Sequence, residues 1–271
     1  MLGKLLRQEF RATYRPFLLL YGATLLLTLL EFIGFQINQP VMGLIAMLAL
    51  MLLSLVMLVL TVVQIARRYS NNLYRGEGYL MFSLPVPAWQ LLVAKLIPAV
   101  LWICLSMLLF FVGQFSVVFA VGGVFEGGVV AEINRVFLEA GLPSLRVYAS
   151  LLPVMAVMYF IEMVFFVLLI YFSITLANTG RFQGHSTLFG ALIFLGLYLI
   201  YCVAEWAAMF LIPLGLQIGE DGWSFVLQGS KMVLENGAYQ MGLGYFPLAL
   251  AVLVLLFWLT ASRINRHLSL K

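Results

Sequence analysis

Three glutamates stand inside long apolar runs of this sequence: Glu31, Glu162 and Glu205. An ionisable group at membrane depth is costly, about 2.5 to 3.5 kcal/mol for Asp, Lys or Arg at a helix centre, and by default marks a functional interior. Glu162 and Glu205 follow Tyr159 and Tyr201 by one helical turn, so each tyrosine could donate a hydrogen bond to its glutamate. Glu31 lies near the outer end of its run, where we expect it at the membrane interface.

Two interpretations of Glu162 and Glu205 stay open, because neither has a cation within helical reach in the sequence. Burial without a cation favours the protonated form, in which case both carboxyls are structural. Alternatively, they line a substrate path with Tyr159 and Tyr201 and contact a polar or cationic part of the substrate.

Glu9 lies within a basic, amphipathic segment, residues 1–16, that we expect to form a helix along the membrane surface. The positions three and four residues from Glu9 offer no cation, so it has no partner in its own helix. We therefore predict that Glu9 forms a brace with Arg67, Arg68 or a residue of another subunit. The alternative is a plain membrane anchor. The basic residues of the segment recur every three or four positions: Lys4, Arg7, Arg11 and Arg15.

The sequence contains no pattern typical of catalysis or of nucleotide binding. G-x-x-x-x-G-K-[ST] is absent, and Gly229-Ser230-Lys231 lacks the spacing of a phosphate-binding loop. His185 and His267 form no H-E-x-x-H, and no serine or cysteine stands beside a credible base. We therefore expect no enzyme activity, no catalytic residue, no metal site and no cofactor bound by this chain.

The composition indicates a membrane protein. Of 271 residues, 64% are hydrophobic and only 10% are charged, whereas a soluble domain is about half apolar and a quarter charged. About 20 apolar residues cross the hydrocarbon layer as a helix, and helices satisfy every backbone group there. We predict an all-α polytopic protein with one domain, 1–271. Its six predicted transmembrane helices are Phe17–Gly34, Val41–Ala66, Leu96–Phe125, Val147–Ala177, Leu188–Leu216 and Gly242–Ala261.

The distribution of basic residues predicts the orientation. With the N-terminus in the cytosol, twelve of the 15 Lys and Arg residues lie inside, and only Arg135, Arg146 and Lys231 lie outside. Both termini and the loop 67–95 are then cytosolic, and the segments 126–146 and 217–241 are external.

The loop 67–95 has the features of a protein-docking element. A turn at Gly76 and Gly78 precedes the apolar residues 79–82, and prolines at 85 and 87 follow. Exposed aromatic residues beside a turn are typical of a docking surface. The alternative is an interfacial loop whose aromatic rings lie at the level of the lipid headgroups.

The run Asn72 to Val86, N-L-Y-R-G-E-G-Y-L-M-F-S-L-P-V, with Gln90-Leu91-Leu92 and Lys95 after it, resembles one loop of bacterial ABC transporter permeases of the type-2 (exporter) family. That loop runs roughly N-L-Y-x-D-E-G-Y-L-x-x-T-L-P-V and ends at Ser-Lys. The resemblance covers about thirty residues closely, and elsewhere only the six-span layout and the basic first helix agree. This chain departs from the pattern at Gly76, Ser83 and Ala94, where the family has Asp, Thr and Ser.

The resemblance implies a cytosolic coupling helix between spans 2 and 3 that docks in a cleft of an ABC ATP-binding subunit, through Glu77, Gly78, Tyr79, Leu80, Met81 and Phe82. It also implies a second permease, identical or related, with ATP and Mg bound by the partner ATPase. For Gly219–Gly242 it implies re-entrant helices, and the stretch from Trp223 to Leu234 reads as helical. We expect the bilayer and no nucleic acid as further partners, and location in the bacterial plasma membrane.

These features favour the permease subunit of an ATP-driven ABC exporter that moves amphiphilic cargo such as an antimicrobial peptide, a drug or a lipid. One alternative is an ion-coupled secondary transporter or channel that uses Glu162 and Glu205, which gradient-driven transport by this chain alone would indicate. Another is a membrane immunity or sensor protein, which resistance retained with an inactive partner ATPase would indicate.

Overall fold

The computed structural model describes residues 2–37, 40–74, 86–121, 128–178, 185–219, 222–227 and 239–266. Six of its helices are long and apolar enough to cross a membrane, so the prediction of a multi-pass, mainly helical membrane protein is confirmed. They are α1 (Leu2–Gln36), α2 (Pro40–Tyr74), α4 (Ala88–Val121), α6 (Leu145–Ala177), α7 (Ser186–Leu211) and α8 (Tyr245–Arg266). The remaining elements are the helix α5 (Val129–Glu139) and the strands β1 (Gly215–Gly219), β2 (Gly222–Val226) and β3 (Tyr239–Gly242).

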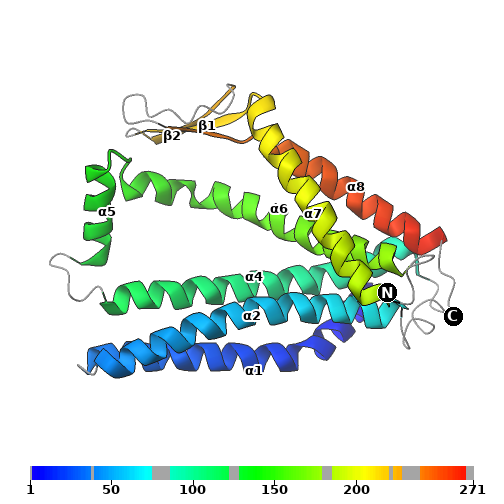
Figure 1. The fold of residues 1–271 in the computed structure, drawn as a ribbon, viewed down its shortest axis with the longest axis horizontal. Helices are drawn as coiled ribbons and strands as arrows, with labels where there is room; N and C mark the ends of the chain where they lie inside the picture. The colour runs from blue at the N-terminus through cyan, green and yellow to red at the C-terminus, as the bar shows by residue number, and fades with distance from the viewer. Residues whose placement is uncertain are drawn as a thin grey trace. The chain divides into compact units, whose positions relative to one another are not determined.

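The chain divides into two compact units, which we describe separately. The first comprises Met1–Val129 and Ala261–Lys271. In it α1, α2 and α4 run side by side along their length (Figure 1). Fully buried side chains such as Leu50, Met57 and Leu92 fill the first unit, while many apolar side chains on its helices are exposed. An apolar exterior is what lipid-facing helices require.

The first helix is longer than expected. We predicted a surface helix over 1–16 followed by a separate span, but α1 is continuous through Pro16. Figure 1 shows that it changes direction in its N-terminal part, as helices commonly do near a proline. Its 35 residues extend about 52 Å at 1.5 Å per residue, which exceeds the hydrocarbon layer of about 30 Å. The polar residues before Phe17 therefore have room outside that layer.

Two glycines set the approach of α1 to α2. A methyl group on Gly34 would place its carbon 2.8 Å from the backbone nitrogen of Gly43, so the two backbones meet where no side chain fits. Small residues at such crossings are typical of membrane helices.

We predict that Gly34→Ala destabilises the protein by about 1 to 3 kcal/mol, because the helices must separate to admit the methyl group. Gly22→Ala is the matched control in α1, since its methyl group meets no described atom within 4 Å. Alanine is the better helix former, so we expect Gly22→Ala to be neutral or slightly stabilising. Thermal unfolding of the detergent-purified protein checks both, and equal shifts for the two variants would contradict the close approach.

The second unit, Val130–Thr260, combines α6, α7 and a small sheet. The sheet is antiparallel, with strand order β2-β1-β3. Alternation along β1 places Leu216 and Ile218 on one face, where they join a buried cluster with Val147, Leu151 and Met158 of α6. The indole nitrogen of Trp223 in β2 donates to Ser150 Oγ of α6 at 3.0 Å.

The sheet corrects the expectation of helical structure over Gly219–Gly242. Residues 222–226 and 239–242 are strands, while residues 228–238 lie outside the described ranges. The pairing of Gly219 with Gly222 leaves a two-residue connection between β1 and β2. Gly222 has φ of +135°, a conformation that favours glycine. The predicted span to Leu216 is also too long, because α7 ends at Leu211 just before Pro213.

Candidate functional site

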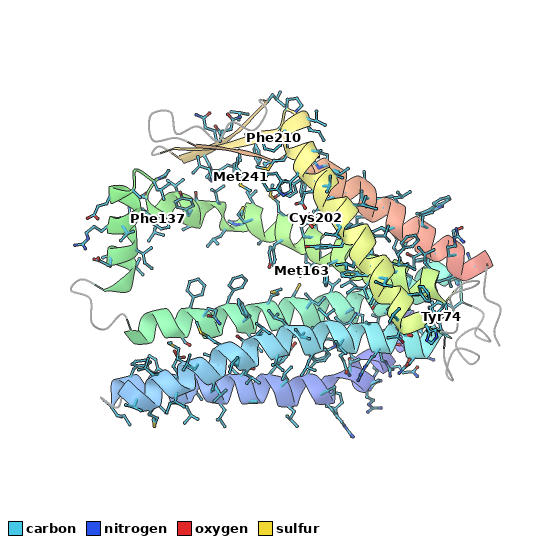
Figure 2. All side chains as sticks on the ribbon, in the orientation of Figure 1. Tyr74, Phe137, Met163, Cys202, Phe210 and Met241 are labelled. Atoms are coloured by element: carbon cyan, nitrogen blue, oxygen red, sulfur yellow. The ribbon has the colours of Figure 1, made fainter. Side chains whose placement is uncertain are left out.

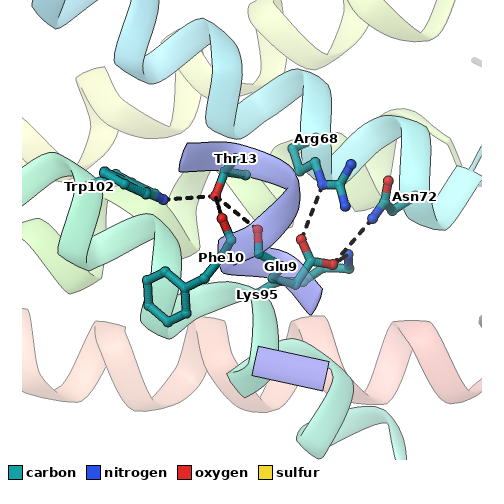
Figure 3. Close-up of polar contacts among 7 residues, drawn as sticks. All are labelled: Glu9, Phe10, Thr13, Arg68, Asn72, Lys95 and Trp102. Atoms are coloured by element: carbon teal, nitrogen blue, oxygen red, sulfur yellow. Dashed lines mark hydrogen bonds and ion pairs between the residues drawn. The ribbon is translucent and has the colours of Figure 1, made fainter. Parts of the chain in front are cut away.

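The best-defined polar site lies where the N-terminal part of α1 meets the end of α2 and the start of α4 (Figure 3). At its centre is the buried carboxylate of Glu9. Lys95 Nζ lies 2.7 Å from Glu9 Oε1, and Arg68 Nε lies 3.1 Å from Glu9 Oε2. Asn72 Nδ2 also donates to Oε1, at 3.2 Å. We call these four residues the Glu9 cluster.

The structure confirms Arg68 as a partner of Glu9, which was one of the alternatives predicted. Arg67, the other arginine considered, makes no ion pair within the described ranges. Lys95 and Asn72 were missed. Asn72 follows Arg68 by four residues and so lies on the same face of α2; that spacing was the one available signal. Nothing local to Glu9 pointed to Lys95.

The Glu9 cluster places one negative charge against two positive charges in a buried setting. Only 4% of the Lys95 side chain and 6% of the Glu9 side chain are exposed, so water screens this pair weakly. Glu9 precedes the apolar run that begins at Phe17. Burial alone raises the pKa of the Glu9 carboxyl, but the charges of Lys95 and then Arg68 outweigh it and hold that pKa below its ordinary value.

A second set of contacts joins the same part of α1 to α4. The indole nitrogen of Trp102 donates to Thr13 Oγ1 at 2.9 Å, and Thr13 in turn donates to the backbone oxygen of Glu9 at 2.9 Å. The Trp102 ring also stacks on Phe17, with 4.5 Å between ring centroids, and meets the edge of Phe10. Polar and aromatic contacts therefore fix α1 against α4 beside the Glu9 cluster.

Hydrogen bonds continue this connection along the three helices. The hydroxyl of Tyr21 in α1 donates to the backbone oxygen of Trp102 at 3.0 Å and lies 2.8 Å from Ser106 Oγ. Ser106 Oγ lies 2.8 Å from Thr61 Oγ1 of α2. Because apolar contacts alone specify helix register weakly in lipid, such bonds help to fix one arrangement of α1, α2 and α4.

The Glu9 cluster joins the two helices, α2 and α4, that flank the segment predicted to dock a partner. Arg68 and Asn72 belong to the last two turns of α2, which ends at Tyr74. Lys95 lies about two turns after the start of α4 at Ala88. The predicted docking residues Glu77, Gly78, Tyr79, Leu80, Met81 and Phe82 all lie outside the described ranges, within the gap 75–85.

The second predicted site is assembled between helices of the other unit. The Tyr201 hydroxyl of α7 donates to Glu162 Oε1 of α6 at 3.2 Å. The sequence indicated that Tyr201 could donate to Glu205 in its own helix, whereas this hydrogen bond crosses to Glu162 of α6. Glu205 follows Tyr201 by four residues and so lies on the same face of α7. Tyr159, the other tyrosine predicted here, has 47% of its surface exposed.

Glu31 lies in surroundings that the sequence did not predict. Its side chain is fully buried, while its expected position at the membrane interface stays a prediction. The Ser116 hydroxyl of α4 is 2.9 Å from Glu31 Oε2. Its other oxygen, Oε1, has no hydrogen-bond partner within the described part of the chain. A burial of this kind favours the neutral carboxyl.

No family model, curated protein or solved structure matches this chain. Within the described ranges, no three His, Cys, Asp or Glu side chains converge in a way that could hold a metal ion. Three features of the chain bear on its function: the Glu9 cluster, residues 75–87 between α2 and α4, and the carboxylates of α6 and α7.

Proposed function

We propose that this chain is the membrane-spanning permease subunit of an ATP-driven ABC exporter in a bacterial plasma membrane. The observation that carries the proposal is the Glu9 cluster. It ties the start of α1 to both helices that flank residues 75–87, the segment whose sequence resembles the coupling loop of type-2 permeases.

The cluster gives this segment a mechanical connection to the bundle. A partner that pushes on residues 77–82 moves the end of α2 and the start of α4. Because Glu9 binds side chains of both helices, and Trp102 is fixed to Thr13 and Phe17, α1 moves with them. The displacement is then transmitted to α1, α2 and α4 together.

In this proposal the partner ATPase, which binds ATP and Mg, supplies the displacement. Two permease chains, identical or related, enclose the path. ATP binding draws two ATPase subunits together and shifts each permease from an inward-open to an outward-open arrangement, and hydrolysis resets it. The nucleotide thus biases a two-state equilibrium of the helices. The basic residues around the Glu9 cluster are on the cytosolic side, where the ATPase is.

Reconstitution in liposomes tests the proposal. The chain is incorporated with an ATPase carrying a G-x-x-x-x-G-K-[ST] motif from an adjacent reading frame, and efflux of a fluorescent amphiphile is followed. We expect efflux only with the ATPase and hydrolysable ATP. Equal efflux from liposomes that contain this chain alone would contradict the proposal.

A second candidate function is ion-coupled transport by this chain alone. The hydrogen bond between Tyr201 and Glu162, with Glu205 nearby, is the observation that favours it. Carboxylates within a membrane bundle commonly carry protons or cations. In the same liposomes, uptake driven by a proton or sodium gradient without ATPase would support this function.

A further inference from the structure

The carboxylates of α6 and α7 belong to a larger group of side chains in the second unit, which we call the acid–tyrosine site: Glu162, Tyr198, Tyr201, Glu205 and Tyr245. Figure 2 locates it by the labelled Met163 and Cys202, the chain neighbours of Glu162 and Tyr201.

The geometry brings these residues together from three helices. Tyr201 donates to Glu162 at 3.2 Å, and Glu205 follows Tyr201 by one turn on the same face of α7. On α6, Met158 precedes Glu162 by one turn, and the Tyr245 hydroxyl at the start of α8 lies 3.7 Å from Met158 Sδ.

The described residues of this unit provide no cation for the acid–tyrosine site. Arg135 forms ion pairs with Glu132 and Glu139 of α5. Arg146 precedes Glu162 by sixteen residues, and His185 precedes Tyr201 by the same interval, which is about 24 Å along a helix. Two carboxylates in an apolar bundle without a cation are costly, and a positively charged ligand would relieve that cost.

The aromatic rings make the site suitable for an organic cation. Tyr201 is buried against Phe165, with 4.0 Å between ring centroids. Tyr198, one turn before Cys202, stacks on Phe194 and is 39% exposed. Tyr198 also precedes Tyr201 by three residues and so lies on the same face of α7. Aromatic faces attract ammonium and related cations, and the attraction is stronger where water is excluded.

We infer that the acid–tyrosine site binds an apolar organic cation, whose charge lies between Glu162 and Glu205 and whose body contacts the tyrosine rings. If this cation is the exported cargo, the inference rests on the proposed export function. The amphiphilic cargo would then be limited to positively charged molecules. As a binding site it stands without the ATPase.

Equilibrium binding of radiolabelled tetraphenylphosphonium to the full-length chain in lipid nanodiscs tests the inference. The charge of this probe does not depend on pH. Tetraphenylborate, with nearly the same shape and the opposite charge, is the matched control ligand. We expect saturable binding of the cation and no saturable binding of the anion. Because this comparison uses the wild-type chain, it does not depend on how any variant folds.

Variants locate the binding. We expect Glu162→Gln and Glu205→Gln each to weaken binding of the cation by roughly tenfold or more. Glu31→Gln, which also removes a buried span carboxyl but lies in the other unit, should bind the cation as wild type does. Tyr198→Phe keeps the ring and should retain affinity, whereas Tyr198→Leu should lose it. Thermal unfolding confirms that each variant is folded.

Two results would overturn the inference: absence of saturable tetraphenylphosphonium binding to wild type, or unchanged affinity in folded Glu162→Gln and Glu205→Gln. Neither result affects the proposed ATPase partnership, because ATP-dependent efflux in the liposome assay is measured separately. Conversely, cation binding with no ATP-dependent efflux would leave the site intact and contradict the export function.

Discussion

Glu9→Gln is expected to lower the free energy of unfolding by about 3 to 5 kcal/mol, the usual cost of removing one partner of a buried ion pair. The substitution keeps the size of the side chain but removes the carboxylate that faces the buried ammonium of Lys95 and the guanidinium of Arg68. If the proposed function is correct, ATP-driven efflux falls as well, because α1 no longer follows the ends of α2 and α4. Chemical unfolding in detergent measures the first effect, and the liposome assay measures the second.

Two further variants separate the buried pair from a general loss of charge. Glu139→Gln removes an exposed carboxylate that pairs with Arg135, and we expect no measurable change, since surface pairs contribute little. The double variant Glu9→Gln with Lys95→Gln should be more stable than Glu9→Gln alone, because it removes one of the two cations that would otherwise face a neutral side chain at position 9. Equal losses for Glu9→Gln and Glu139→Gln would contradict the account of this cluster.

The pH dependence of the free energy of unfolding tests the same cluster independently. The folded-state pKa of Glu9 lies below its ordinary value, so its contribution to stability is fully present above the pKa of an unfolded-state glutamate. That contribution is lost as the pH falls through the folded-state pKa. The stability of wild type relative to Glu9→Gln should therefore shrink on acidification, and a constant difference would contradict the assigned ion pair.

Substitutions in the predicted docking residues 77–82 are expected to have the second large effect, a loss of affinity for the ATPase. If the proposed function is correct, Tyr79→Ala combined with Phe82→Ala should weaken binding of the partner ATPase by at least about thirtyfold, because losing even one buried aromatic anchor at such an interface costs about 2 kcal/mol or more. Binding of the purified ATPase to nanodisc-embedded chain, followed by surface plasmon resonance, measures the loss.

Trp89→Ala is the matched control for this pair. It removes an exposed aromatic residue from the first turn of α4, outside the predicted docking residues. We expect it to keep most of the affinity for the ATPase. If all of these alanine variants bound the ATPase like wild type, the segment would have to be reinterpreted as an interfacial loop.

The six spans could be predicted because each depends only on local composition: a run of about 20 apolar residues has few alternatives to a helix in lipid. The continuity of α1 could not be predicted, because a proline at position 16 is compatible with either a break or a bend in the helix. The β-sheet was missed because β1 and β2 have only five residues each. In so short a stretch, apolar residues fit a helical or a strand period equally well.

The candidate sites show the same limit. Helical spacing identified Glu9 as lacking a partner in its own helix, and Arg68 was among the partners considered. Lys95 is 86 residues away in the chain, and its contact with Glu9 depends on how α1 packs on α4. The bond from Tyr201 to Glu162 likewise depends on packing between α6 and α7. Contacts between helices are long-range properties, which spacing within one helix cannot predict.

Photocrosslinking from position 79 would show directly whether an ATPase contacts residues 77–82. A chain with a photoreactive phenylalanine in place of Tyr79 is expressed in its native cells and irradiated, and its adducts are identified by mass spectrometry. We expect an adduct with a soluble protein that carries a G-x-x-x-x-G-K-[ST] motif. Adducts confined to lipid or to proteins of the outer face of the membrane would contradict this expectation.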